Sequence, residues 1–175
     1  MRIVFPLSSD HLITLVQYNV LRAFMTNVHM LRLLHIIPPE CSVALCVLPA
    51  STNPPESIPE QFHPTVLQRT VPHPSYIDAI PHPIWRDNLI LAQGNYDEDD
   101  MCDDICGGLW DGFPDSECQL RGTVAWSTPW HASGWEISEG FFRKWGWVLK
   151  GCGDVLEATN RWRALRGEDP LVAEL

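Results

Sequence analysis

Apolar residues in the first part of the chain recur at intervals of three and four positions. This spacing places them on one face of a helix, so residues 10–35 are predicted to form a long amphipathic helix. Ser8 or Ser9 can cap its N-terminus, and the Pro38-Pro39 pair ends it. The positions that share the apolar face are Leu12, Leu15, Val16, Val20, Phe24, Val28, Leu31 and Leu34.

Further helices are predicted from apolar clusters, capping residues and acidic first turns, with glycine or proline at most of their ends. They cover residues 40–48, 84–93, 97–109, 135–151 and 154–166, with a single helical turn at residues 75–80. Residues 123–126 are the one predicted strand, and it is expected to be isolated. The chain is therefore expected to be a mostly α, single-domain bundle of about five to seven helices over residues 1–175, with at most one short strand.

Prolines interrupt the middle of the chain. Most of the fifteen prolines lie between Pro38 and Pro83, which predicts a long, irregular connection between two helical regions. Within this connection, residues 49–64 have little apolar content and are predicted to form an exposed, flexible loop.

The formal net charge of −10 opposes direct binding to nucleic acid, because phosphate neutralisation requires a surface rich in lysine and arginine. The longest apolar-looking stretch, residues 12–34, contains polar and charged side chains, so no membrane span is expected. Pro6 and the polar residues after it interrupt the apolar N-terminus, which is atypical of a secretory signal. We therefore expect an intracellular protein, nuclear or cytoplasmic, with reduced cysteines.

Charges are unevenly distributed along the chain. Acidic residues concentrate between Asp97 and Glu117, whereas half of the twelve basic residues lie in the C-terminal third. This asymmetry predicts complementary pairing between the two segments, within one chain or between chains. The basic residues concerned are Arg143, Lys144, Lys150, Arg161, Arg163 and Arg166.

The sharpest catalytic candidate is the acidic string at residues 99–104. Asp99, Asp100 and Asp103 fit the DDxxD pattern by which all-α terpenoid enzymes hold Mg²⁺ against a diphosphate. A second metal-binding motif is not found in the sequence, so a solvated acidic helix N-terminus is the preferred interpretation. The Mg²⁺-dependent enzyme remains the alternative hypothesis.

Metal and nucleophile motifs give weaker signals. Cys41 and Cys46 are separated by four residues, and Cys102 and Cys106 by three, but neither pair has the spacing typical of zinc sites. Buried apolar cysteines are the preferred interpretation. Neither a nucleophile elbow nor a glycine-rich phosphate loop is found in the sequence, so no metal and no cofactor is predicted.

Six of the eight tryptophans lie between Trp126 and Trp162, interleaved with arginine and lysine. They are predicted to form an aromatic core between the last two helices and the first, with arginines stacked on the rings and paired to acids such as Glu136 and Glu139. Alternatively, some of them line a protein-binding groove or a small-molecule pocket. A ligand sensor would need a closed pocket of several hundred cubic ångströms.

Several distinctive strings occur in one order along nearly the whole chain. They are Phe5-Pro6-Leu7-Ser8-Ser9-Asp10-His11-Leu12, Gln17-Tyr18-Asn19-Val20, Leu67-Gln68-Arg69-Thr70-Val71-Pro72-His73-Pro74, Arg86-Asp87-Asn88-Leu89-Ile90, Gly134-Trp135-Glu136, Lys144-Trp145-Gly146-Trp147 and Thr159-Asn160-Arg161-Trp162-Arg163. The set resembles an uncharacterised fungal domain family that commonly follows the bZIP region of fungal bZIP-type transcription factors. The resemblance implies transcriptional regulation. A basic region with heptads is not found before Ser8, so DNA binding is not carried over.

The sequence thus predicts a non-catalytic regulatory or interaction domain, which works through protein partners or a small apolar ligand. A set of polar and aromatic residues, nearly all from the family strings, is expected to join helices through mutual hydrogen bonds. They are Tyr18, Asn19, Arg22, Arg69, Arg86, Asp87, Asn88, Trp135, Glu136, Trp145, Asn160, Arg161 and Arg163.

Overall fold

The computed structural model describes residues 9–36, 57–105 and 122–172. These ranges contain two short strands, β1 (Thr123–Ala125) and β2 (Trp135–Ile137), and six α-helices. The predicted mostly α class is confirmed. The helix predicted at residues 40–48 lies outside the described residues. The six helices are α1 (Ser9–Met30), α3 (Val66–Thr70), α4 (Pro83–Ala92), α5 (Glu98–Ile105), α6 (Glu139–Trp145) and α7 (Gly153–Leu165).

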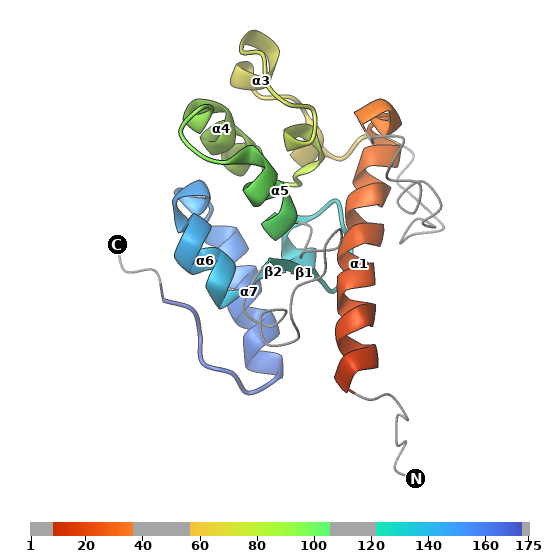
Figure 1. Ribbon diagram of the computed structural model, residues 1–175, viewed down its shortest axis with the longest axis vertical. Coiled ribbons are helices and arrows are strands. Elements are labelled where there is room, and N and C mark those ends of the chain that lie inside the picture. Colours follow the sequence, from red (N-terminus) through yellow and green to blue (C-terminus); the bar gives the residue numbers. More distant parts are fainter. Residues whose placement is uncertain (1–8, 37–56, 106–121, 173–175) are drawn as a thin grey trace.

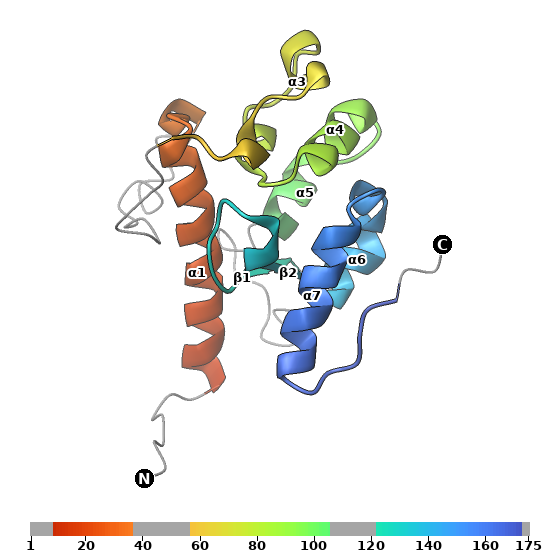
Figure 2. The ribbon, with the colours of Figure 1, turned by 180° about the vertical axis from the view of Figure 1, so that it is seen from behind.

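The small sheet lies between the first and last helices. In both ribbon views, α1 runs along one side of the molecule and α7 lies on the other side of β1 and β2 (Figures 1 and 2). One apolar cluster, which includes Val20 of α1 and Trp135 of β2, joins α1 to the sheet. The tryptophan-rich part of the chain therefore meets α1 through the sheet.

The main core lies on the α7 side, where α4, α5 and α6 pack. Its fully or almost fully buried members come from widely separated segments, and they include Ile77, Leu89, Ile137, Phe141 and Val155. Burying such side chains contributes about 1.5–3 kcal/mol each relative to an exposed position. This cluster holds the middle of the chain against its C-terminal end.

Strand β2 corrects two predictions. It pairs antiparallel with β1, with Ala125 opposite Trp135, so the prediction of an isolated strand is wrong. The helix predicted over residues 135–151 is also wrong at its start, because all three residues of β2 are buried and extended. Ser138 is the N-cap: its side chain accepts a hydrogen bond from the Phe141 N–H, and α6 begins at Glu139. A 3₁₀ turn, Gly146–Leu149, then follows α6.

The end of α1 also differs from the prediction, which continued the helix to residue 35. The helix ends at Met30, and Arg32 has a left-handed backbone with φ of 59°. The Arg32 N–H donates to the His29 carbonyl at 3.1 Å, and the Leu33 N–H donates to the Val28 carbonyl at 2.8 Å. These two bonds form a Schellman motif, in which glycine normally occupies the left-handed position. An arginine there gave no sequence signal for termination.

Replacing Arg32 by glycine is expected to stabilise the protein by about 0.5–1 kcal/mol, because the left-handed conformation costs roughly that much more for an L side chain. The matched control is Arg32→Ala, which removes the same charge and keeps the strained backbone. The free energy of unfolding, measured by urea denaturation, should rise only for the glycine variant. An equal gain for alanine would assign the effect to the charge.

The proline-rich connection contains more regular structure than predicted. Helix α3 was not predicted, although Thr65 and Gln68 form a capping box at its N-terminus. Short 3₁₀ turns lie at Glu60–Phe62 and Ile77–Ala79, the second within the predicted single turn at residues 75–80. The helices predicted at 84–93 and 154–166 are confirmed as α4 and α7, and that at 97–109 is confirmed as α5 over Glu98–Ile105.

Candidate interaction surface

Arg86 of α4 is a buried hub for the connection before it. Its side chain is fully buried and donates to the carbonyls of Gln61 (2.8 Å), Ile80 (2.7 Å) and His63 (3.2 Å). Its Nε also donates to the Gln68 side chain at 2.9 Å. Burial lowers the pKa of Arg86 to about 10, against the opposing effect of nearby carboxylates. Arg86 is therefore still a cation at neutral pH.

This hub bears on the predicted flexible loop at residues 49–64. Residues 49–56 lie outside the described residues. In the described part, Phe62 is 4% exposed, and its ring lies 5.9 Å from the Arg86 guanidinium carbon. Residues 57–64 are thus bonded to α4 at two carbonyls.

His82 links the N-termini of two helices. Its Nδ1 accepts a hydrogen bond from the Trp85 N–H at 3.2 Å and so caps α4, while its Nε2 lies 2.9 Å from the Asp154 carboxylate of α7. A ring nitrogen that accepts a hydrogen bond from a backbone N–H carries no proton. The proton is therefore on Nε2, and this N–H donates a hydrogen bond to the Asp154 carboxylate. Both ring nitrogens are committed to structural bonds. This arrangement leaves His82 without the free nitrogen that a general base needs.

The acidic helix α5 is paired with the basic segment, within one chain. Lys144 of α6 contacts Asp100 at 2.6 Å and Asp104 at 2.7 Å. Asp104 is buried and also accepts from the Trp145 indole N–H at 2.6 Å. Hydrogen bonds to these two carboxylates raise the pKa of Lys144, although partial burial opposes that rise. The predicted charge pairing is therefore present within the chain.

The DDxxD carboxylates are described only in part. Asp100 is bonded to an ammonium group, and the side chain of Asp103 lies outside the described residues. Among the described residues, no three histidine, cysteine, aspartate or glutamate side chains are grouped so that they could hold a metal ion.

Glu136 of β2 organises the C-terminal aromatic residues. It is 5% exposed and forms a bidentate pair with Arg166, at 2.6 and 2.8 Å, while accepting from the Trp126 indole N–H at 2.6 Å. Arg166 lies over the Trp126 ring at 5.3 Å, and Trp126 packs against Trp162 at 5.9 Å. The hydrogen bonds that Arg166 donates to Glu168 and Glu136 raise the pKa of Arg166. The arginine–tryptophan stacking was predicted in kind, with Glu136 as one of its acids.

The remaining predicted residues fall into two groups. Asn88 donates to the Val148 and Lys150 carbonyls, and Asn160 exchanges two hydrogen bonds with Leu171. Asp87 accepts from the Thr65 hydroxyl, Trp135 donates to the Pro129 carbonyl, and Arg163 donates to the Asp169 carbonyl. The others lie at or near the surface, namely Tyr18, Asn19, Arg22, Arg69 and Arg161. Arg22 lies over the Tyr18 ring, and Arg69 donates to the Pro64 carbonyl.

The loop that joins β1 to β2, residues 126–134, is held from three sides. The Pro129 carbonyl accepts from Asn27 of α1 at 2.9 Å and from the Trp135 indole at 2.9 Å. The Ser133 carbonyl accepts from the Trp162 indole of α7 at 3.0 Å. The backbone N–H of Trp126 donates to the Gly134 carbonyl at 2.8 Å. Three helices or strands therefore fix one surface loop.

Between this loop and α1 lies a groove of about 310 Å³. Its lining includes Asn19, Arg22, Trp126, Ser127, Thr128 and Trp130. In the described part of the chain, the side chains of Asn19, Ser127, Thr128 and Trp130 form no hydrogen bond, and Trp130 forms no ring contact. These polar groups are therefore available to a partner. Ser127, Thr128 and Trp130 were not among the predicted site residues.

A second groove, of about 470 Å³, is bordered by His131 and Ala132 of the same loop. It is lined by three histidines, His63, His82 and His131, together with Glu60 and Asp154. His82 is already bonded to Asp154, and His131 lies 2.9 Å from the Ser133 hydroxyl.

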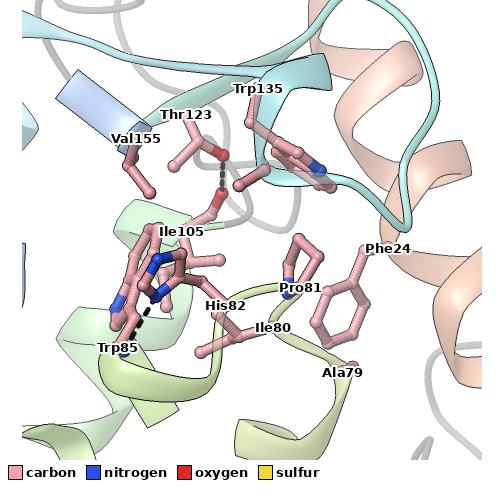
Figure 3. A pocket seen from close by; sticks show the side chains of 11 residues that line it. Phe24, Ala79, Ile80, Pro81, His82, Trp85, Ile105, Thr123, Trp135 and Val155 are labelled. Carbon is pink, nitrogen blue, oxygen red and sulfur yellow. Dashed lines mark hydrogen bonds between the residues drawn. The ribbon is translucent and has the colours of Figure 1, made fainter. Parts of the chain in front are cut away.

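A small apolar cavity lies beside Ala132 of the loop and Trp135 of β2 (Figure 3). It measures about 20 Å³ and is lined by Phe24, His82, Trp85, Trp135 and Val155, among others. The Thr123 hydroxyl beside it is already bonded to the Ile105 carbonyl, as Figure 3 shows. The volume is sufficient for one water molecule and is far below the size predicted for a ligand sensor.

A family model described as a domain of unknown function, DUF3425, matches residues 46–156. The match covers more than half of the chain. The chain belongs to the DUF3425 family. Neither a comparison with curated proteins nor one with solved structures found a match.

The DUF3425 match contains the Arg86 hub, the β1–β2 loop and the pairing of α5 with α6. Helix α1 precedes the matched range. The groove therefore combines a loop of the DUF3425 region with a helix outside that region. No described helix of this DUF3425 protein is both long and apolar enough to cross a membrane.

Several structural residues of this DUF3425 protein escaped the sequence analysis. Asn27 is fully buried and bridges α1 to the Ala79 and Pro129 carbonyls. Its only sequence signal is a polar residue beside Val28 on the apolar face of α1. His82 directly before Pro83 was a better signal, because a polar residue before a proline is typical of a helix N-cap.

Proposed function

We propose that this DUF3425 protein is a non-catalytic regulatory domain of the kind associated with fungal bZIP-type transcription factors, and that it works in the nucleus through protein partners. The resemblance of its sequence strings supports the transcriptional role. The observation that carries the proposal is the β1–β2 loop, which is rigidly held and yet presents exposed polar and aromatic side chains.

The physical argument concerns how the loop is stabilised. Surface loops are usually among the mobile parts of a protein, but this loop accepts hydrogen bonds from Asn27, Trp135 and Trp162. A rigid surface loses little conformational entropy when a partner binds, so more of the contact energy appears as affinity. Tryptophans in such positions are typical of residues that dominate binding energy at interfaces.

Several acidic and basic side chains already form structural contacts, which supports the non-catalytic part of the proposal. His82 uses both ring nitrogens in structural bonds, and Lys144 neutralises Asp100 and Asp104. Catalysis requires such groups to be free for proton transfer or metal binding. Burial also raises the pKa of the Cys152 thiol to about 12, which disfavours its nucleophilic thiolate form.

A tethering experiment tests the regulatory role. Residues 1–175 are fused to an unrelated DNA-binding domain that controls a reporter gene. The fusion is expected to change reporter output, and the double variant Thr128→Ala and Trp130→Ala is expected to return output to that of the DNA-binding domain alone. Both side chains line the groove, and neither forms a hydrogen bond within the described residues.

The control variant is Leu165→Ser, because Leu165 is 77% exposed at the end of α7 and is not one of the residues that line the groove. It should match the unmodified fusion, and circular dichroism should show that all variants are folded. A fusion without effect on the reporter, or a double variant that is fully active, would contradict the proposal.

A further inference from the structure

We propose that the groove between α1 and the β1–β2 loop binds a proline-rich protein segment in the polyproline II conformation. The inference rests on the proposed function and names the chemistry of the partner. Trp130 is the central residue of the proposed site.

The groove contains hydrogen-bond donors that suit a polyproline II segment. A polyproline II segment has no internal hydrogen bonds, so its carbonyl groups point outward and need donors. The groove offers the Trp130 indole N–H and the Asn19 amide, neither of which has a partner in the described part of the chain. Most other predicted polar residues, such as Asn88 and Asn160, already use their amides internally.

The groove also offers an aromatic surface, the ring of Trp130. Proline-rich segments dock on exposed aromatic rings. Trp126 already packs against Trp162 and Arg166. Trp130 is half-buried, and no ring or cation packs on it within the described residues. It is therefore the ring in the groove on which proline rings can stack.

The polarity and charge of the lining favour a polyproline II segment over an amphipathic helix or a nucleic acid. An amphipathic helix needs an apolar groove, whereas Asn19, Ser127 and Thr128 make this lining largely polar. Nucleic acid needs several cations, and Arg22 is the one charged residue among the described lining residues. The lining has no carboxylate among them, although the chain carries a net charge of −10. The groove therefore does not repel a neutral or acidic segment.

Both the β1–β2 loop and a polyproline II helix are preorganised for binding. The polyproline II helix is already stiff before it binds, so little entropy is lost on the side of the partner. The loop is fixed through the Pro129 and Ser133 carbonyls, so little is lost on the side of the groove. Two rigid surfaces can form a specific complex over a small area.

The test uses fluorescein-labelled decaproline as the probe and the full chain as the protein, with binding followed by fluorescence anisotropy. A glycine–serine peptide of equal length is the control ligand. Decaproline is expected to bind at least about tenfold more tightly than the control peptide. Trp130→Ala is expected to weaken binding by about tenfold or more, a typical loss for an aromatic residue at the centre of an interface.

Two further variants sharpen the result. Trp130→Phe retains a ring and removes the N–H, so its affinity should fall between those of the unmodified protein and Trp130→Ala. Trp147→Ala is the control, because Trp147 is 40% exposed, packs against Tyr96 and Trp145, and does not line the groove. Its removal should leave binding unchanged. Equal binding of the two peptides, or an unaltered affinity of the folded Trp130→Ala variant, would overturn the inference.

The tethering experiment distinguishes this failure from failure of the proposed function. If the double variant Thr128→Ala and Trp130→Ala abolishes the effect on the reporter while decaproline does not bind, the interaction domain stands and the polyproline partner is wrong. If the double variant leaves the reporter unchanged and decaproline does not bind, both are wrong.

Discussion

Replacing Gly134 by alanine is expected to lower the free energy of unfolding by about 3 kcal/mol, the upper part of the range for overpacking a tight site. A Cβ at this position would lie 2.3 Å from the Thr128 carbonyl oxygen and 3.0 Å from its carbon. Both are backbone atoms, so no side chain can rotate away. The loop itself would have to move.

The movement would break the bonds that fix the loop. The Gly134 carbonyl accepts from the backbone N–H of Trp126 and Ser127, and the Gly134 N–H donates to the His131 carbonyl. Urea denaturation followed by circular dichroism measures the loss of stability. The groove should also be distorted, so decaproline binding should weaken at temperatures where the variant is still folded.

The matched control is Gly153→Ala at the start of α7, where an added Cβ meets nothing within 4 Å. This change should be neutral or stabilising by up to about 1 kcal/mol, because alanine favours a helix more than glycine does. A loss for Gly134→Ala no larger than the change for Gly153→Ala would show that the loop adapts easily.

The helical part of this fold was predictable because it depends on local spacing. Apolar spacing identified α1 and α4, and glycine or proline gave most of the boundaries, including those of α7. Termination of α1 was not predictable, because Arg32 adopts the left-handed conformation that glycine usually takes. The bonds at this helix end, and not the residue type, determine where the helix ends.

Strand β2 was missed for a different reason. Ile137 lies four residues before Phe141, a spacing typical of a helix, so three residues of strand joined to a short helix resemble one longer helix. The deciding contacts are nonlocal. Glu136 pairs with Arg166 of the C-terminal segment, and the Ile137 N–H donates to the Thr159 hydroxyl of α7.

The candidate surface was predictable only in part. Asn19 and Arg22 were among the predicted site residues, and both line the groove. Trp130 and Thr128 were not, because their importance comes from the loop that carries them. That loop is positioned by Asn27, which is more than a hundred residues away in the chain. No local sequence pattern contains this information.

Replacing Arg86 by methionine is expected to cost about 3–5 kcal/mol, comparable to removing one partner of a buried charged network. The guanidinium donates to three backbone carbonyls and to Gln68, and it is fully buried. Methionine fills much of the volume but donates no hydrogen bond. The carbonyls of Gln61, His63 and Ile80 would therefore lose this donor, and an unsatisfied buried group such as the Ile80 carbonyl costs about 1–3 kcal/mol.

The pH dependence of this effect is also determined. Burial lowers the folded-state pKa of Arg86 to about 10 from an ordinary value of 12.5. Below pH 10 the residue is charged in both the folded and the unfolded chain, so the two bind equal numbers of protons and the stability contribution of Arg86 stays constant. The difference between the unmodified protein and Arg86→Met should accordingly be the same at pH 6 and pH 8.

Two variants complete the test of the hub. Arg86→Lys keeps a positive charge but lacks the planar fork, so it should recover only part of the lost stability. Arg69→Met removes an exposed arginine that donates to the Pro64 carbonyl, and it should cost less than about 1 kcal/mol. Because Arg86 holds residues 57–64 to α4, limited proteolysis of Arg86→Met should cut first in that segment. Unfolding in which this segment is no more sensitive than α7 would show that the hub does not hold the connection.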